Sequence, residues 1–368
     1  FFNAPMADDR DKRYMEMALA LARKGAGRTS PNPLVGAVLV RGGKIAGAGY
    51  HRRAGGDHAE IVALRRAGKK GRGATLYLNL EPCSHHGRTP PCALSLIRAG
   101  VRRVVVGMVD PNPLVSGKGI RKLRQARIRV DVGLLERECR RLNEAFSKHI
   151  TRQVPFIILK LAASLDGRIA ASTGDSRWVT GSVSRQYVHR LRNQVDAVLI
   201  GAGTVLADDP RLTCRLRGGR DPWRVVLDGR LRIPLKARLL RRRDPEKTII
   251  ITGSRAPAGK IKTIRRTGAT VWQLPLRAGR IPFTAVLKRL GKMGLNSVMI
   301  EGGAITASWA LKEGIVDKIL FFYAPKLIGG EGKEMIGGLG IRQMAQCKSI
   351  KDIEIKKLGD DLLVSGYL

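Results

Sequence analysis

The sequence predicts an α/β protein made of two domains, residues 6–150 and residues 151–368. Its 368 residues exceed what one ordinary hydrophobic core accommodates. Residues 133–150 have the pattern of a charged helix, which Thr151-Arg152-Gln153-Val154-Pro155 then interrupts. Beyond this boundary, strand-like apolar runs alternate with helical segments, as is typical of an α/β layout. The expected strands are residues 156–159, 197–200, 224–227, 248–252, 297–300 and 319–323.

In the first domain, four chemically distinctive side chains lie where helices and strands are expected to begin or end. These side chains are His58, Glu60, Cys83 and Cys92. The first two lie at the start of a helix expected over residues 59–67, because the apolar spacing there is helical and a polar loop precedes it. The third follows a buried strand expected over residues 75–80, and the fourth opens a helical segment. Helix starts also favour thiolates.

Three of these residues match the ligand set of a catalytic zinc ion. The His58 imidazole and two thiolates would neutralise Zn²⁺ and leave one tetrahedral position for a water, which the metal acidifies into a nucleophile. Glu60 is placed to carry a proton from that water to a leaving amine, which is the role of the carboxylate in the His-x-Glu motif of zinc deaminases. The pattern therefore predicts a zinc-dependent hydrolytic deaminase.

A closed, purely structural zinc site is the alternative for the same residues. His85 or His86 would then supply a fourth protein ligand, and no position would remain for water. Taken singly, a histidine is more often a satisfied polar residue, and a cysteine more often fills a small space in a core. The combination of these residue types in a strand–loop–helix context favours the catalytic site.

The net charge of +38 raises the alternative of a nucleic-acid-binding protein. A tRNA or RNA-editing deaminase, or an RNA-binding protein with a structural zinc, would account for such a charge. However, the basic residues are spread along the chain, and an aromatic fraction of 5% is too low for an array of base-stacking side chains. We therefore expect no specific nucleic-acid partner.

Cysteine usage and hydropathy indicate a cytoplasmic protein. Two of the five cysteines are assigned to zinc, and Cys139, Cys214 and Cys347 lack disulfide-like spacing. No apolar run approaches the length of a membrane span, so no membrane association is expected. The sequence is compatible with a homo-oligomer but does not specify one.

Two strand-to-helix junctions of the second domain could receive a dinucleotide. Gly201-Ala202-Gly203-Thr204 follows one expected strand, but Leu206 stands where a dinucleotide-binding fingerprint has its third glycine. Glu301-Gly302-Gly303-Ala304 follows another strand and precedes a helix over residues 305–312, whose first backbone amides could bind a pyrophosphate. On pattern alone, an ordinary glycine-rich turn explains each junction equally well.

The segment around the two cysteines narrows the family. Eight residues separate Cys83 from Cys92, where nucleoside and tRNA deaminases usually have two. The string EPCSHHGRTPPC at residues 81–92 resembles, almost letter for letter, the deaminase half of the bifunctional deaminase/reductases of riboflavin biosynthesis, as do residues 31–36 and 110–113. This resemblance implies a cytidine-deaminase-like α/β/α fold with zinc on His58, Cys83 and Cys92 and proton transfer by Glu60. It also implies pocket positions at Asn32, His51, His85, Arg88, Asp110 and Asn112.

Residues 160–168, 174–180, 204–210 and 301–303 resemble the reductase half of the same family, which has a dihydrofolate-reductase-like fold and uses NADPH. The resemblance implies nucleotide contacts and substrate contacts. The nucleotide contacts fall on Ala162, Trp178, Thr204, Asp208 and the segment from Gly303 to Trp309. The substrate contacts fall on Ser176, Arg192, Leu212, Arg215 and Glu301. The two arginines suit a ribose phosphate, because guanidinium groups bind phosphate bidentately. Gly229 departs from relatives that carry a cofactor-contacting serine there.

The resemblance implies two successive reactions on a phosphorylated pyrimidine. The first half would hydrolyse the 2-amino group of 2,5-diamino-6-(5-phosphoribosylamino)pyrimidin-4(3H)-one, with Glu60 moving protons. The second half would reduce the phosphoribosyl group to a phosphoribityl chain by hydride transfer from NADPH to the sugar C1′ carbon. Lys160, Asp208 and Glu301 are candidates to orient the substrate or manage protons in that step.

Overall fold

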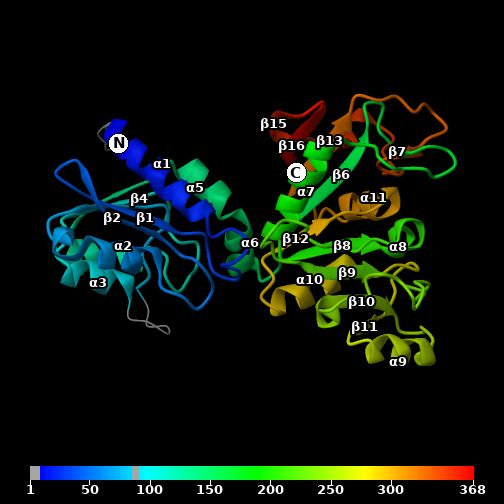
Figure 1. The fold of residues 1–368 in the computed structure, drawn as a ribbon, viewed down its shortest axis with the longest axis horizontal. Coiled ribbons are helices and arrows are strands. Elements are labelled where there is room, and N and C mark those ends of the chain that lie inside the picture. Colours follow the sequence, from blue (N-terminus) through cyan, green and yellow to red (C-terminus); the bar gives the residue numbers. More distant parts are fainter. Residues whose placement is uncertain (1–8, 85–90) are drawn as a thin grey trace. The chain divides into compact units, whose positions relative to one another are not determined.

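The chain folds into two compact units in the computed structural model, which describes residues 9–84 and 91–368 (Figure 1). The division falls between Gln153 and Val154. It follows directly after helix α6 (Glu144–Arg152), so the boundary that the sequence predicts at residue 150 lies within the last turn of that helix. Each unit has its own sheet and its own hydrophobic clusters.

The single helix expected over residues 133–150 is wrong, because two helices occupy this segment. Helix α5 (Glu136–Leu142) ends and α6 begins on either side of Asn143, which has non-helical backbone angles. The Asn143 side chain is buried and bonds to the main chain of Leu34: its Oδ1 accepts from the Leu34 N–H at 2.8 Å, and its Nδ2 donates to the Leu34 carbonyl at 3.0 Å. This tertiary contact replaces the helical continuity that the sequence pattern favours.

The first unit is a three-layer α/β/α structure around a five-stranded sheet. The strand order is β2-β1-β3-β4-β5. Strand β1 is antiparallel to both β2 and β3, and the pairs β3–β4 and β4–β5 are parallel. The strands are β1 (Gly36–Arg41), β2 (Lys44–Tyr50), β3 (Thr75–Leu78), β4 (Arg103–Val106) and β5 (Arg129–Val132). Alternate strand residues supply the two cores on opposite faces, as the period of two requires.

Helices α1 (Asp9–Arg23) and α5 cover one face of this sheet. Helices α2 (Ala59–Ala67), α3 (Cys92–Arg98) and α4 (Lys118–Gln125) cover the other. Helix α2 has the bounds that the sequence predicts, and β3 is the expected strand that leads to Cys83. Because α2 and α3 pack on the same face, their first residues can contribute to one site.

The second unit is built on a nine-stranded sheet with the order β11-β10-β9-β8-β12-β6-β13-β16-β15. The strands from β11 to β13 are parallel, and the C-terminal hairpin β15–β16 adds two antiparallel strands at one edge. Its strands are β6 (Phe156–Ser164), β8 (Ala197–Gly201), β9 (Trp223–Leu227), β10 (Thr248–Gly253), β11 (Thr270–Leu274), β12 (Ser297–Ile300), β13 (Lys318–Ala324), β15 (Lys351–Leu358) and β16 (Asp361–Tyr367). All six strands predicted for this unit are present.

Helices lie on both faces of this sheet. Buried residues of α10 (Phe283–Lys292) and α11 (Ala304–Lys312) join the core on one face. Those of α7 (Ser182–Gln194), α8 (Ala202–Asp208) and α9 (Ala258–Arg266) pack on the opposite face. The short strands β7 (Arg168–Ala170) and β14 (Lys333–Glu334) pair separately. The 3₁₀ turns are Gly68–Gly71, Pro245–Lys247 and Met344–Gln346.

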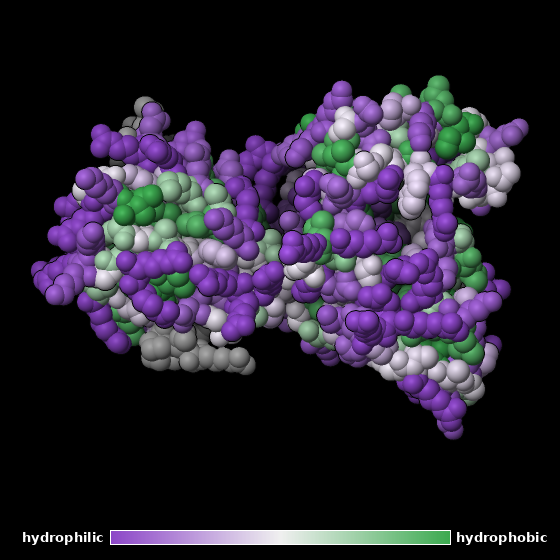
Figure 2. All heavy atoms as spheres, viewed as in Figure 1, coloured by the Kyte–Doolittle hydropathy of each residue, from purple (hydrophilic) through white to green (hydrophobic). Residues whose placement is uncertain are grey.

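Hydrophilic residues cover most of the visible surface of both units, and apolar residues form separate small patches (Figure 2). Within residues 9–84 and 91–368, no helix combines the length and the apolar character needed to cross a membrane.

Close packing of α2 on β2 depends on Gly47. A Cβ atom at this position would lie 2.3 Å from the Ala63 carbonyl oxygen and 2.7 Å from the Ala67 nitrogen, both backbone atoms of the helix. We predict that Gly47→Ala lowers the free energy of unfolding of the first unit by about 1–3 kcal/mol, the usual cost of overpacking. Urea titration of the purified variant would measure this.

Gly259→Ala is the control, because a Cβ there meets no atom within 4 Å and the position is helical. Alanine is the better helix former, so this variant is expected to be as stable as the wild type or more stable. Equal stability of Gly47→Ala and wild type would contradict the packing argument.

Candidate active sites

The three expected zinc ligands converge in the first unit. His58 is the N-cap residue of α2, Cys92 is the first residue of α3, and Cys83 lies in the segment that follows β3. The His58 Nδ1 atom is 3.1 Å from the Cys92 Sγ and 3.7 Å from the Cys83 Sγ, and the ligand atoms of the three residues all lie within 4.8 Å of one another. Among the described residues, no other group of three His, Cys, Asp or Glu side chains is arranged in this way.

The donor set of this cluster suits zinc. Two sulfur atoms and one imidazole nitrogen are the ligands that Zn²⁺ prefers, and three protein ligands are typical of its catalytic sites. A hydrogen bond from Cys92 lowers the pKa of the Cys83 thiol to about 4, and His58 contributes to the same shift. The Cys92 main-chain N–H also donates to the Cys83 Sγ at 3.3 Å. The site therefore already favours a thiolate at Cys83.

Glu60 is the proton-transfer candidate and lies in the first turn of α2. Its side chain is buried, with 3% exposed, and its Oε2 atom has no hydrogen-bond partner among the described residues. Burial raises the pKa of the Glu60 carboxyl, although the positive charge of His58 opposes the shift. A buried carboxyl with a raised pKa beside the ligand cluster is suited to accept a proton and to donate it again.

Two of the expected pocket residues lie beside His58. The His51 ring meets the His58 ring edge-on, with 5.6 Å between their centroids. The His51 Nδ1 is 3.0 Å from the Asp57 carbonyl oxygen, and its Nε2 is 3.1 Å from the Asn32 Nδ2. A neutral ring that donates to Asp57 and accepts from Asn32 satisfies both contacts, and burial lowers the pKa of His51 accordingly.

The other residues expected in the deaminase pocket lie in two segments of the chain. Asp110 and Asn112 form a turn in which the Asn112 N–H donates to the Asp110 Oδ1 at 2.8 Å. His85, His86 and Arg88 lie outside the described residues.

In the second unit, the two glycine-rich junctions lie side by side, because β8 and β12 are adjacent parallel strands. A Cβ atom at Gly201 would lie 2.6 Å from the Thr306 Oγ1, and one at Gly302 would lie 2.9 Å from the Thr306 Cβ. Gly303 is the N-cap residue of α11 and has open space on its Cβ side. The start of α11 is therefore accessible to a ligand that approaches close to the backbone.

The residues expected to contact the nucleotide come from neighbouring parts of this sheet. Ala162 belongs to β6, which pairs with β12, and Thr204 belongs to α8, which begins directly after β8. Asp208 is the last residue of α8. Trp178 is 62% exposed, and the Arg185 guanidinium lies 4.7 Å from its ring centroid. Ala162 and Thr204 therefore lie near the carboxyl ends of parallel strands, where open α/β sheets bind their ligands.

Arg192 and Glu301 form a bidentate ion pair. The Arg192 Nε donates to the Glu301 Oε1 at 2.7 Å and its Nη2 donates to the Oε2 at 2.8 Å, while its Nη1 donates to the Thr213 carbonyl at 3.2 Å. The Lys160 Nζ is 4.0 Å from the Glu301 Oε2. Burial would raise the pKa of Glu301, but Arg192 outweighs it and holds the pKa at about 2. The Arg192 guanidinium is therefore paired with the Glu301 carboxylate of the protein itself.

The other expected substrate contacts differ in exposure. Leu212 is 3% exposed and packs in a core, so its side chain faces away from solvent. Ser176 is half-buried in the segment before α7. Most of the Arg215 side chain is exposed. The part of it that is buried lowers the pKa of its guanidinium, and the nearby positive charges of Arg192, Arg211 and Arg238 lower the pKa further. Positive charge is therefore concentrated around Arg215.

His189 is a residue of this region that the sequence analysis missed. It lies on α7 one turn before Arg192, and its Nδ1 is buried without a hydrogen-bond partner in the part of the chain that the structure describes. Burial lowers the pKa of His189, and Arg192 and Arg215 add to the shift. The i, i+3 spacing from Arg192 on one helix is the signal that could have found it.

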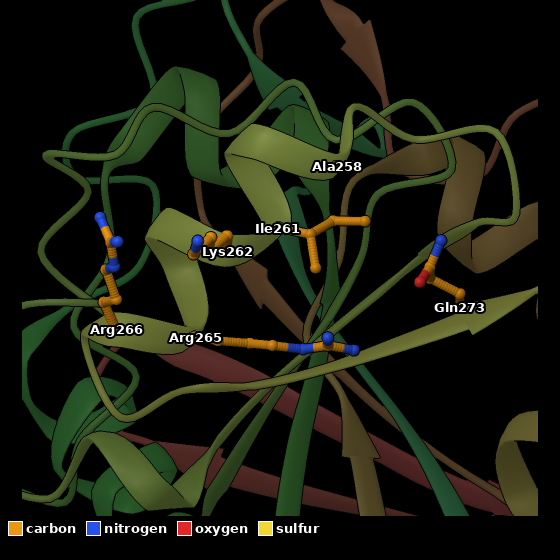
Figure 3. Close-up of a pocket in the computed structure, with 6 residues that line it drawn as sticks. All are labelled: Ala258, Ile261, Lys262, Arg265, Arg266 and Gln273. Carbon is orange, nitrogen blue, oxygen red and sulfur yellow. The ribbon is translucent and has the colours of Figure 1, made fainter.

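A groove of about 550 Å³ is formed by residues of α9 and β11 (Figure 3). It is lined by Ala258, Ile261, Lys262, Arg265, Arg266 and Gln273. None of the predicted site residues that the structure describes lines it.

Comparisons with known proteins match both halves of the chain. The family model described as the cytidine and deoxycytidylate deaminase zinc-binding region matches residues 8–108, and the model described as the RibD C-terminal domain matches residues 155–364. The riboflavin biosynthesis protein RibD of Aquifex aeolicus is 47% identical over 96% of this chain and 97% of its own length. That of Escherichia coli is 41% identical over 96% of this chain and 98% of its own length.

Two solved structures agree over almost the full length. Acinetobacter baumannii RibD superposes with a TM-score of 0.87 at 38% identity, and the alignment covers 98% of this chain and 99% of that one. A Thermotoga maritima protein has a TM-score of 0.86 at 38% identity with the same coverage. That protein is described as a diaminohydroxyphosphoribosylaminopyrimidine deaminase/5-amino-6-(5-phosphoribosylamino)uracil reductase.

These matches confirm the predicted fold class, a cytidine-deaminase-like domain followed by a reductase domain. A zinc-binding deaminase domain and a reductase domain imply a zinc ion and a nicotinamide cofactor. The match over residues 155–364 also accounts for the part of the chain that a tRNA deaminase or a zinc-bearing RNA-binding protein would leave unexplained. With both halves matched in this order, the chain belongs to the RibD family of bifunctional deaminase/reductase enzymes of riboflavin biosynthesis.

Proposed function

We propose that His58, Cys83 and Cys92 bind the zinc ion of the deaminase half and that Glu60 is its proton-transfer residue. The substrate would be 2,5-diamino-6-(5-phosphoribosylamino)pyrimidin-4(3H)-one. The observation that carries the proposal is the convergence of the three ligand atoms within 4.8 Å beside a buried carboxyl. When bound, zinc supplies an acidified water that can attack the ring carbon bearing the 2-amino group.

The protein's own residues would supply the proton transfers and the orientation. Glu60 would take a proton from the attacking water and pass it to the leaving amine, which its raised pKa and unpartnered Oε2 suit. His51 is held on both ring nitrogens by Asn32 and Asp57, so its ring would form a fixed wall beside His58. Fixed polar groups orient a substrate without having to reorganise.

In the reductase half, we propose that NADPH binds along the glycine-rich junctions that follow β8 and β12. Ala162, Trp178, Thr204, Asp208 and the segment from Gly303 to Trp309 would contact the nucleotide. NADPH supplies a hydride to the sugar C1′ carbon once the ring has opened. The start of α11 at Gly303 suits the pyrophosphate, because its backbone N–H groups and the helix dipole favour an anion.

The Arg192–Glu301 pair would orient the sugar rather than bind its phosphate. Both Glu301 oxygens are already held by Arg192, and Lys160 lies 4.0 Å from one of them. Arg215 is exposed near other arginines and is the better placed of the two predicted phosphate ligands. Ser176 and the main chain at Leu212 would complete the substrate contacts.

Glu60→Gln tests the deaminase half. We predict that ammonia release from the diaminopyrimidine phosphate falls about 10²- to 10⁴-fold, because glutamine cannot shuttle a proton. NADPH oxidation with the already deaminated substrate should remain near the wild-type rate. Paired assays of ammonia release and NADPH consumption would measure both.

Glu136→Gln is the matched control for this test, because Glu136 is an exposed partner of Arg140 on α5. Its rates should equal those of the wild type. If Glu60→Gln stopped both reactions in a folded protein, the two sites would not be independent.

Arg192→Ala tests the reductase half. The pKa of Glu301 is held low by Arg192, so Glu301 should protonate at a higher pH in the variant. We predict that the rate of reduction falls about 10²-fold, because the orienting carboxylate is no longer held in place. The acid limb of its pH profile should move to higher pH, while deamination persists. Steady-state assays across pH would show this.

Arg190→Ala is the control, since Arg190 is exposed on the same helix and lies 5.4 Å from the centroid of the Tyr187 ring. A pH profile of Arg192→Ala that matched that of Arg190→Ala would rule out the proposed role of the ion pair.

We also propose that the charge of +38 does not form a specific nucleic-acid site. Hydrophilic residues are spread over the visible face of both units rather than gathered on one (Figure 2). We predict that binding to single-stranded RNA weakens steeply as salt rises and shows no sequence preference, because phosphate contacts alone would drive it. Fluorescence anisotropy with two unrelated RNAs would measure this, and deamination of tRNA at physiological salt would contradict it.

A further inference from the structure

The carboxylate of Glu81 lies inside the first unit, two residues before Cys83 and 3% exposed. We propose that Glu81 is a positioning residue of the deaminase site, which holds Cys83 in place through the start of α4. This inference rests on the proposed role of Cys83 as a metal ligand.

Glu81 accepts four hydrogen bonds from backbone N–H groups. Its Oε2 accepts from Asp110 at 3.1 Å and from Gly117 at 2.9 Å, while its Oε1 accepts from Gly119 at 2.9 Å and from Ile120 at 3.2 Å. The donors belong to two features: the segment that follows β4 and the first turn of α4. One side chain therefore fixes both features against the end of β3.

These bonds are strong because the acceptor is charged and lies at a helix start. An ionised carboxylate forms shorter and stronger bonds with N–H groups than a neutral acceptor does, and the dipole of α4 adds to the attraction. All four bonds require acceptor atoms. Glutamine has nearly the same shape, but its NH₂ group would face two N–H donors in place of an oxygen.

The groups on both sides of Cys83 are held to the same helix. A Cβ atom at Gly119 would lie 2.1 Å from the Pro82 carbonyl oxygen, so α4 packs directly on the residue before Cys83. The Lys122 Nζ, also on α4, donates to the carbonyl of Ser84, the residue after Cys83, at 2.9 Å. The segment that carries the Cys83 sulfur is thus held against α4, through the Glu81 carboxylate and through contacts with Gly119 and Lys122 of that helix.

The same carboxylate reaches the Asp110–Asn112 turn. The Asp110 N–H that donates to Glu81 belongs to the residue whose side chain accepts from the Asn112 N–H at 2.8 Å. Loss of the Glu81 acceptors would therefore disturb a ligand-bearing segment and this turn together. A residue that served only as a helix cap would affect the stability of α4 and leave the metal geometry unchanged.

Cobalt substitution distinguishes these two roles. Co²⁺ is added to the metal-free full-length wild type and to Glu81→Gln, and the thiolate-to-cobalt charge-transfer band and the rate of metal release to a chelator are recorded. We predict an altered band and metal release about 10- to 100-fold faster in the variant, the usual effect of removing a group that orients a ligand. The rate of deamination should fall with it, and the reductase rate should not.

Asp11→Asn is the matched control, because Asp11 is another buried carboxylate of the same unit. It bonds to Tyr77 and Arg103, and Tyr77 packs in the core on the face of the sheet opposite to α2 and α3. This variant should lose stability but keep the wild-type band and release rate below its unfolding temperature. If Glu81→Gln behaved like Asp11→Asn or like the wild type, the positioning role would be disproved.

Two further measurements separate the remaining outcomes. If wild type showed no thiolate band, or if Cys83→Ser left the band unchanged, the proposed zinc site itself would fail. If Glu81→Gln did not fold, Lys122→Met would replace it, since among the described residues this half-buried lysine donates to the Ser84 carbonyl. Faster metal release in Lys122→Met supports the role of α4, and an unchanged rate opposes it.

Discussion

Both candidate sites depend on one constraint, the geometry of helices that begin at the carboxyl ends of strands in a sheet. Parallel strands place their carboxyl ends at one edge, and the helices that follow present free N–H groups and a positive dipole there. In the first unit, this geometry brings His58 at the start of α2 to Cys92 at the start of α3. In the second, it places the start of α11 beside the junction after β8. Different chemistry is thus supported by the same backbone arrangement.

Three carboxylates that are buried or partly buried show how their surroundings set their roles. Glu301 is held ionised by Arg192, which keeps its pKa at about 2. Glu81 is ringed by four backbone N–H groups and has a fixed set of partners. Glu60 keeps one oxygen without a partner, and burial raises its pKa. A carboxyl whose acceptor atoms are all occupied can orient its neighbours, whereas one with a free atom and a raised pKa can move a proton.

Local sequence patterns predicted much of the fold and of the metal site. The helix at α2 and the six strands of the second unit follow from apolar periodicity and from turn residues, which act within a few positions of the chain. The interruption at Asn143 could not be predicted in this way, because it depends on the main chain of Leu34, more than a hundred residues earlier. Strand β15 was also missed: Ile353 and Ile355 alternate with charged residues, but charged residues outnumber apolar ones in this strand and nearly all of it is exposed. The Arg192–Glu301 pair joins residues 109 apart, and no sequence spacing marks it.

The long separation of the two cysteines need not disturb the metal geometry, because the segment between them is closed at its base. The Cys92 N–H donates to the Cys83 Sγ at 3.3 Å, and the Ala93 N–H donates to the Cys83 carbonyl at 3.2 Å. These two bonds bring the start of α3 against Cys83, and they involve no residue of the intervening segment. Because the entropic cost of closing a chain segment rises only slowly with its length, the number of residues between two fixed ends has a small effect on the free energy. Eight intervening residues are therefore compatible with ligand atoms that lie within 4.8 Å of one another.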